Sequence, residues 1–170
     1  MTYTVVVGVD GSEYGDAALR MALAEAEEHH GRVTAVFAWQ VPFSSFPGLY
    51  ERAELEQAGK NFLIEKVSAV APSPKVPLLP LVAEGDPAEA LVAAAKDANL
   101  LVLGTRGRTR MAGFLLGSVS ARCAAAAPCR YCSSKRHRIP LKPDSRAVRC
   151  LAEPCGGDAG YSGRVHPPDG

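Results

Sequence analysis

The stretch GTRGRTRMAGFLLGS, residues 104–118, follows directly after the apolar run LLVL at residues 100–103. An apolar run of this length is typical of a buried strand. The stretch that follows it is rich in glycine and arginine, and a short helix is expected to begin near Ser118. Glycine lets the backbone approach a ligand closely, and a helix N-terminus attracts anions. The pattern therefore predicts a phosphate-binding loop, and the alternative is an ordinary surface loop.

The glycines of this loop have the spacing G-x2-G-x9-G-S, at Gly104, Gly107, Gly117 and Ser118. A P-loop requires G-K-[ST], in which the lysine contacts the terminal phosphates, and the loop has no such lysine. The dinucleotide pattern G-x-G-x-x-G is also absent from the first strand and turn, which carry GVDGS at residues 8–12. The spacing excludes both motifs and indicates a different backbone cradle for phosphate.

Strand-like and helix-like segments alternate along most of the chain. Strands are predicted at 2–9, 33–39, 76–82 and 100–103, and helices after Ser12 as far as Gly31, at 51–70, from the cap Asp86 to 98, and from 118 onward. Pro77 and Pro80 favour an edge position for the third strand. This order predicts an α/β fold, in which helices cover both faces of a parallel sheet. Such sheets bind ligands at the carboxyl ends of their strands, where the strand order reverses.

Asp10 follows the first strand in the turn VDGS, residues 9–12. If the first and fourth strands are neighbours, this turn and the glycine-rich loop face the same crevice. A carboxylate there can hold a ribose hydroxyl or a metal ion beside phosphates, and the alternative role for Asp10 is that of a turn or helix-cap residue. His29 and His30 lie in the last turn of the first helix, where favourable contact with the helix dipole is their expected role, and a metal role is the less favoured alternative.

Charge and composition exclude several classes of protein. The formal net charge of the 170 residues is +1, and residues 1–129 carry 11 Lys and Arg against 14 Asp and Glu, a difference of −3. The body of the chain therefore lacks the basic surface of a nucleic-acid-binding protein. The start, MTYTVVVGVDG, has neither a basic signal-peptide region nor an apolar run long enough for a membrane span. We expect a cytoplasmic protein.

Three segments together resemble the universal stress protein family: VVVGVDGS at 5–12, GDPAEALV at 85–92 and GTRGRTRMAGFLLGSVS at 104–120. The glycine spacing is similar to that of the ATP-binding branch of the family. The resemblance implies a Rossmann-like sheet of the kind found in adenine nucleotide alpha hydrolases, with strand order 3-2-1-4-5. That order would place the first and fourth strands side by side, as the crevice requires.

The resemblance also implies which residues contact the nucleotide. Val9 and Asp10 would lie near the adenosine, and Ala38 would line the adenine pocket. The residues expected around the ribose and phosphates are Leu103, Gly104, Gly107, Gly117, Ser118, Val119 and Ser120, to which Arg106, at a variable position of the loop, is added. The expected ligand is ATP with Mg²⁺ or Mn²⁺, and no residue is assigned as a metal ligand of its own.

The expected function is a stress sensor or regulator that holds ATP, with at most slow and incidental hydrolysis. No general base beyond Asp10 and no lysine directed at a phosphate is found, so we assign no catalytic residue. Two alternatives remain. One is a protein-interaction module whose pocket stays empty, and the other is an ATP-dependent enzyme of related fold, which would need a further catalytic motif.

The carboxyl-terminal part of the chain departs from the family pattern. After Cys129 the pattern requires an apolar strand, whereas residues 130–144 read RYCSSKRHRIPLKPD. We therefore expect residues 1–129 to form the universal stress protein domain, the fifth strand to be missing, and residues 130–170 to form an irregular, disordered tail. Loss of this strand would leave an open apolar edge on the fourth strand and put in doubt the homodimer that the resemblance implies.

The tail also allows a second reading, as a metal or redox site. Cys129 and Cys132 form a C-x-x-C pair, and the chain carries His137, Cys150, Cys155 and His166 downstream. These later spacings match no usual zinc pattern. The basic run KRHR, residues 135–138, could contact nucleic acid.

A single-base deletion near codon 130 would explain the tail. A frame shifted by one base reads codons 129–134 as Pro or Ser, an aliphatic residue, Leu and two further apolar residues, provided that both serines have TCN codons. We predict that resequencing the DNA restores a frame that encodes an apolar strand. An intact frame through codon 134 would contradict this hypothesis.

Overall fold

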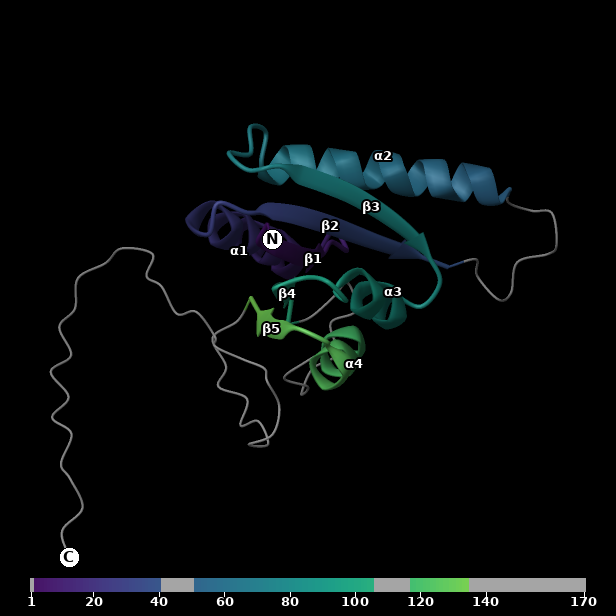
Figure 1. Ribbon diagram of the computed structural model, residues 1–170. Coiled ribbons are helices and arrows are strands. Elements are labelled where there is room, and N and C mark those ends of the chain that lie inside the picture. The colour runs from purple at the N-terminus through teal and green to yellow at the C-terminus, as the bar shows by residue number, and fades with distance from the viewer. Residues whose placement is uncertain (1, 41–50, 106–116, 135–170) are drawn as a thin grey trace, which may run out of the picture.

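The computed structural model describes residues 2–40, 51–105 and 117–134. Within these ranges, strands and helices alternate along the chain as the sequence predicts (Figure 1). The elements are β1 (Thr4–Gly8), α1 (Glu13–Glu28), β2 (Arg32–Trp39), α2 (Arg52–Val70), β3 (Leu78–Glu84), α3 (Pro87–Ala94), β4 (Leu100–Leu103), α4 (Ser118–Ala126) and β5 (Arg130–Ser133).

The strands form one parallel sheet in the order β3-β2-β1-β4-β5. Val5 of β1 is in register with Val33 of β2 on one side and with Leu100 of β4 on the other. This confirms the predicted sheet and strand order. The order reverses at β1, so the carboxyl ends of β1 and β4 lie side by side at one edge of the sheet.

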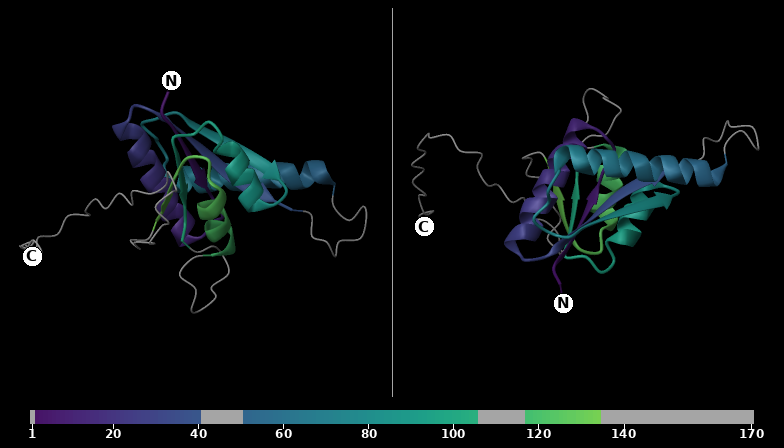
Figure 2. Two further views of the ribbon diagram at one scale, coloured as in Figure 1. Left: turned by 60° about the horizontal axis from the view of Figure 1, so that its bottom comes forward. Right: turned by 90° about the horizontal axis from the view of Figure 1, so that it is seen from above.

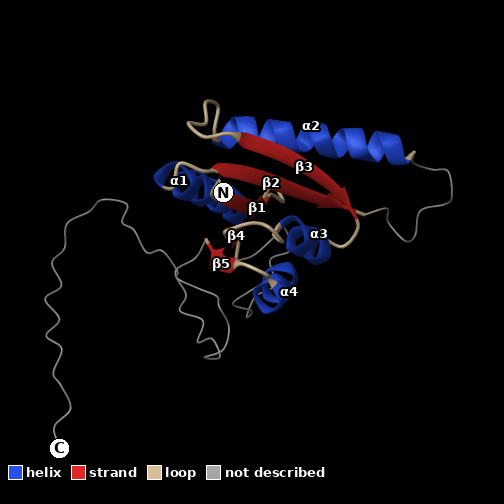
Figure 3. Ribbon diagram, viewed as in Figure 1, coloured by secondary structure: helices blue, strands red, loops and turns tan. Residues whose placement is uncertain are grey.

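α1 and α2 cover one face of the sheet, and α3 and α4 cover the other (Figures 2 and 3). Val5 and Val7 of β1 belong to one buried cluster together with Ala18, Leu19 and Ala22 of α1. Val6 points to the opposite face, where it joins a second cluster with residues of α3 and α4. Because β1 is buried on both sides, every position of its valine run is apolar, as is typical of parallel sheets.

The predicted N-caps of two helices are present. The Ser12 hydroxyl accepts a hydrogen bond from the Gly15 amide at 3.0 Å, and Asp86 Oδ1 accepts from the amides of Ala88 and Glu89. Arg122 of α4 donates to Asp86 Oδ2 at 2.7 Å, which ties α3 to α4 and lowers the pKa of Asp86. The Glu89 carboxylate lies 3.9 Å from Arg122, so it takes part in this ion pair.

Pro80 sits in β3, which is an edge strand as predicted. The carbonyl of Pro77 accepts from Val33, and the amide of Gly85 donates to Trp39, so the odd-numbered residues of this segment direct their backbone polar groups at β2. Pro80 is even-numbered, and its nitrogen therefore faces the free edge. A missing N–H there costs no bond of the ladder and makes the edge a poorer template for another strand.

The expectation that the fifth strand is missing is wrong. β5 pairs in parallel with β4, with Tyr131 opposite Leu101 and Cys132 opposite Val102. Tyr131 and Cys132 are each 2% exposed and face opposite sides of the sheet, in the second and first cluster respectively. Ser133 is also buried, and this short strand is possible because tyrosine favours strands and cysteine packs as a small apolar residue.

Polar residues at the end of β5 are accommodated by hydrogen bonds. The amide of Ser134 donates to the carbonyl of Leu103 at 2.9 Å, and its hydroxyl donates to the carbonyl of Tyr14 at 3.1 Å. Since β5 covers β4, the expected open edge on β4 is also absent. The deletion hypothesis concerns the DNA and stays a prediction, although its structural motive, a missing strand, no longer holds.

Two further expectations concern the carboxyl-terminal tail and membrane-spanning helices. Residues 135–170, which make up most of the predicted tail, lie outside the described residues. In the part of the chain that the structure describes, no helix combines the length and apolar character that a membrane span requires.

Replacing Tyr131 tests whether β5 is part of the folded body. Tyr131→Ala removes a buried ring from the second cluster and should lower the free energy of unfolding by about 3 kcal/mol in urea titrations. Arg130→Ala, at the less buried first position of the same strand, is the control and should change it by less than about 0.5 kcal/mol. Equal small effects of both changes would contradict a packed fifth strand.

Candidate functional site

The candidate site lies where the carboxyl ends of β1 and β4 meet the first turns of α1 and α4. Asp10 leaves β1 and folds back on its own turn: its Oδ1 accepts from the Ser12 amide at 3.0 Å and from the Ser12 hydroxyl at 2.7 Å. Gly11 has a φ of +77°, a conformation that L side chains rarely adopt. Asp10 therefore serves as a turn residue through Oδ1, the alternative role that its sequence position allowed.

The second oxygen of Asp10 has a different environment. Among the residues that the structure describes, Asp10 Oδ2 makes no hydrogen bond, and the side chain is only partly buried. The turn holds the carboxylate in a fixed orientation through Oδ1. A ligand in the crevice could therefore use Oδ2 as an acceptor without breaking the turn.

β4 and α1 approach each other very closely at this edge. A Cβ atom on Gly104 would lie 2.9 Å from the carbonyl carbon of Tyr14 and 3.1 Å from the Gly15 nitrogen. A Cβ atom on Gly15 would lie 2.5 Å from Asp10 Oδ1. Gly104 is thus required by the backbone of α1, and Gly15 is required by the Asp10 carboxylate. Sequence reasoning missed Gly15, although a glycine in the first turn of a helix is a usable signal of close approach.

The first turn of α4 presents to the same edge backbone amides that have no partner within the helix. Gly117 is the N-cap and has no side chain to bond the amides behind it. The first amides of a helix have no partner within the helix, and the helix dipole makes this end electropositive. Because α4 is not capped by a side chain, its first turn is suited to an anion.

Hydrogen bonds join this turn to the end of β4. The Ser120 hydroxyl donates to the carbonyl of Gly104 at 2.6 Å, and the Gly117 amide donates to the carbonyl of Thr105 at 2.8 Å. Ser120 is 5% exposed, so its hydroxyl positions α4, whereas Ser118 is exposed. Of the two serines expected around the ribose and phosphates, Ser118 is therefore better placed than Ser120 to donate its hydroxyl to a ligand.

The apolar residues of the predicted site form its walls and support. Val9 is 4% exposed, and its amide donates to the carbonyl of Val36 at 2.9 Å, which extends β1 toward β2. Ala38 lies further along β2, opposite Ala83 of β3, near the same carboxyl edge. Leu103 is 4% exposed and Val119 is partly buried, and both pack in the second cluster. The structure thus brings these residues to one edge.

Two predicted site residues, Arg106 and Gly107, lie outside the described residues. Thr105, directly before them, was not predicted. It is 2% exposed, and its Oγ1 has no hydrogen-bond partner among the described residues. A buried polar atom without a partner is costly, so this hydroxyl is a further candidate for an interaction in the crevice. Its only sequence signal is its place within the glycine loop.

Ser120→Ala tests the link between α4 and β4. Loss of the hydroxyl leaves the Gly104 carbonyl without this donor, and we expect the free energy of unfolding to fall by about 1 to 2 kcal/mol. Ser118→Ala, two residues earlier and exposed, is the matched control and should have a much smaller effect in the same denaturant titration. A larger loss in Ser118→Ala than in Ser120→Ala would contradict the assignment.

Comparison with known proteins gives a consistent result. The model of the universal stress protein family matches residues 1–130. A universal stress protein of Thermus aquaticus is 35% identical over 136 residues, which cover 76% of this chain and 96% of that protein. A universal stress protein of Mycobacterium tuberculosis is 36% identical over 117 residues, 68% of this chain and 39% of that protein. The chain thus spans about two fifths of the length of this mycobacterial relative.

Solved structures share the fold. A universal stress protein family member from Burkholderia pseudomallei superposes with a TM-score of 0.56 at 27% identity, over 75% of this chain and 92% of that one. A universal stress protein in complex with cAMP gives 0.57 at 24% identity, over 76% and 94%. One from Archaeoglobus fulgidus in complex with dAMP gives 0.58 at 18% identity, over 77% and 95%.

Proposed function

This chain belongs to the universal stress protein family, and from that premise we propose that it binds an adenine nucleotide, ATP in particular, in the crevice between the carboxyl ends of β1 and β4. The observation that carries the proposal is the uncapped N-terminus of α4 beside Gly104. A phosphate group placed there would accept from amides that have no partner within the helix and would gain from the helix dipole.

The glycines give the ligand access to these amides. Gly117 has no side chain to occupy the space in front of α4, and Gly104 brings the end of β4 against the first turn of α1. The phosphates would therefore accept from the backbone amides of Ser118, Val119 and Ser120, while Gly117, whose amide is bonded to the Thr105 carbonyl, leaves the approach to them open. Arg106 and Gly107 are assigned to the same phosphates as part of the glycine loop.

Asp10 and the walls of the crevice are suited to the nucleoside. Asp10 Oδ2 is oriented by the turn and would accept from a ribose hydroxyl. Val9, Ala38 and Leu103 would form the apolar surface for the adenine ring. Apolar walls with a few fixed polar groups are the usual composition of such sites.

ATP is proposed with Mg²⁺ or Mn²⁺ as its companion ion. Two related structures contain cAMP and dAMP, which supports an adenine nucleotide as the ligand class. Mg²⁺ commonly keeps several waters and is bound by substrate phosphates with one or two carboxylates. The companion ion would therefore be held by the ATP phosphates and by waters, and no residue of the chain is assigned as its ligand.

The biological role that we propose is that of a nucleotide-binding stress sensor or regulator in the cytoplasm, with no enzymatic turnover beyond slow hydrolysis. Cys123 and Cys129 are free thiols, which is consistent with a reducing compartment. β5 is an outer strand of the sheet. The homodimer that the family resemblance implies is therefore kept as part of the proposal, with β5 as its interface.

Gly117→Asp tests the site by calorimetric titration of the chain with Mg-ATP. Wild-type protein should bind at about one site per chain. At the N-cap, aspartate would bond the α4 amides with its own carboxylate and would repel phosphate, so ATP affinity should fall by at least about 30-fold. The φ of Gly117 is −68°, which suits any residue, and an aspartate N-cap stabilises a helix. The Tm of the variant should therefore not fall.

The matched control is Ala53→Asp, which places the same charge in the first turn of α2, outside the residues assigned to the crevice. It should leave ATP affinity unchanged. Parallel titrations with ADP, AMP and cAMP test the preference for a triphosphate. Unchanged binding by folded Gly117→Asp protein would contradict the site, and no binding by folded wild-type protein would favour the interaction module instead.

A further inference from the structure

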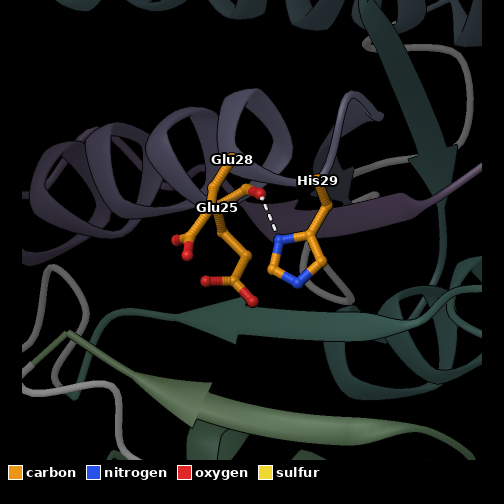
Figure 4. Close-up of side chains that lie close together, drawn as sticks. All are labelled: Glu25, Glu28 and His29. Atoms are coloured by element: carbon orange, nitrogen blue, oxygen red, sulfur yellow. Dashed lines mark hydrogen bonds between the residues drawn. The ribbon is translucent and has the colours of Figure 1, made fainter.

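A second group of ligand-forming side chains lies at the other end of α1, far from the crevice in the chain. Glu25, Glu28 and His29 each offer one ligand atom, and these three atoms all lie within 4.8 Å of one another. Figure 4 shows the three side chains extending to the same side of the helix end. The spacing i, i+3, i+4 explains this, because such residues share one helix face.

The orientation of His29 leaves one particular nitrogen available. His29 Nδ1 lies 3.1 Å from the carbonyl oxygen of Glu25 (Figure 4), and a carbonyl can only accept, so Nδ1 carries the proton. Nε2 of the neutral ring then holds the lone pair. Metal-binding histidines commonly donate their other nitrogen to a carbonyl in this way, which fixes the ring for coordination.

Tyr3 holds two members of the group, His29 and Glu25, in place. Its ring stacks on the His29 ring, with centroids 4.2 Å apart, and its hydroxyl donates to Glu25 Oε1 at 3.0 Å. Burial and this hydrogen bond raise the pKa of Tyr3 to about 12, so the hydroxyl stays a donor at neutral pH. Glu25 is 5% exposed, which is unusual for a glutamate with no cationic partner.

The charges around the group are unbalanced. The last turn of α1 contains no basic residue, although carboxylates are unfavourable at the electronegative end of a helix. Lys75 pairs with Glu27 at 2.7 Å. Within the described ranges no ion pair reaches Glu25 or Glu28. A bound cation would relieve this accumulation of negative charge.

We propose that Glu25, Glu28 and His29 form a binding site for a divalent transition metal ion, with Zn²⁺ as the ion of first choice. One imidazole and two carboxylates are ligands that zinc accepts, and a water would complete four-coordination. Ligand atoms around one zinc ion lie about 3.4 Å apart, so the three ligand atoms, which lie within 4.8 Å of one another, would move closer together on binding.

The site is separate from the proposed nucleotide site. α1 ends where the chain enters β2, so the three residues lie at the amino edge of the sheet, whereas the crevice lies at the carboxyl edge. The metal would therefore not be the companion ion of ATP. The metal would join the end of α1 to Tyr3, which precedes β1. It would stabilise the protein because it binds the folded chain and not the unfolded chain.

The experiment is a titration of the full chain with ZnSO₄ in the absence of nucleotide. Binding is measured by calorimetry and by NMR of the ¹⁵N-labelled histidine rings. The chain has four histidines. We expect the Nε2 signal of His29 to shift while Nδ1 remains protonated. Glu28→Gln should weaken the site by at least about tenfold, since it removes one charged ligand and no recorded structural bond.

Two further variants make the result decisive. His29→Ala should abolish the site, and His30→Asn, which changes the adjacent exposed histidine and tolerates its φ of 50°, should leave it intact. Zinc held by cysteines or by His137 and His166 would not respond to Glu28→Gln. Equal zinc affinity in wild-type and Glu28→Gln protein, or an unmoved His29 signal, would overturn the proposal.

Discussion

β1 pairs in parallel with β4 through Val5, Val6 and Val7, whose partners are Leu100, Leu101 and Val102. These segments are far apart in the chain, and their pairing places β1 in the interior of the sheet, buried on both faces. The connection from β1 runs through α1 on one face, and the connection into β4 runs through α3 on the other. The carboxyl ends of the two strands therefore meet without a helix crossing between them, and every feature of the candidate nucleotide site depends on this arrangement.

Two helix ends carry an electrostatic imbalance, and they lie at opposite edges of the sheet. The N-terminus of α4 has no capping side chain and presents positive partial charge at the carboxyl edge. The C-terminus of α1 gathers carboxylates at the amino edge, where the helix dipole is already negative. Opposite ligand charges would correct the two imbalances, a phosphate in the first case and a metal cation in the second. The fold itself tolerates both because each end is partly exposed to solvent.

Local patterns in the sequence were sufficient for most of the fold. The run at 100–103 becomes β4 with the predicted bounds, and Ser12 and Asp86 cap their helices as expected. β5 was missed because its buried positions are a tyrosine, a cysteine and a serine within a polar segment, and the pairing with β4 that buries them is not local. The resemblance to the universal stress protein family led to the expectation of a longer apolar strand than this chain uses.

The candidate site was predicted less completely than the fold. Those predicted site residues that the structure describes lie at one edge of the sheet, as a crevice between β1 and β4 requires. The double role of Asp10, however, depends on which oxygen the Ser12 hydroxyl bonds, and no sequence pattern specifies that. Gly15 and Glu25 were missed for a related reason, since their importance comes from contacts with Asp10 and Tyr3 that only the packing of α1 creates.

The edge formed by β1, β4 and α4 is proposed to hold an adenine nucleotide. The most direct measurement is the change in backbone amide NMR shifts of the ¹⁵N-labelled chain on addition of Mg-ATP. We expect saturable changes concentrated at Asp10, Gly104 and residues 117–120, with little change at the end of α1 or along β3. Changes confined to β3 and α3, or no saturable change at residues 117–120, would contradict it.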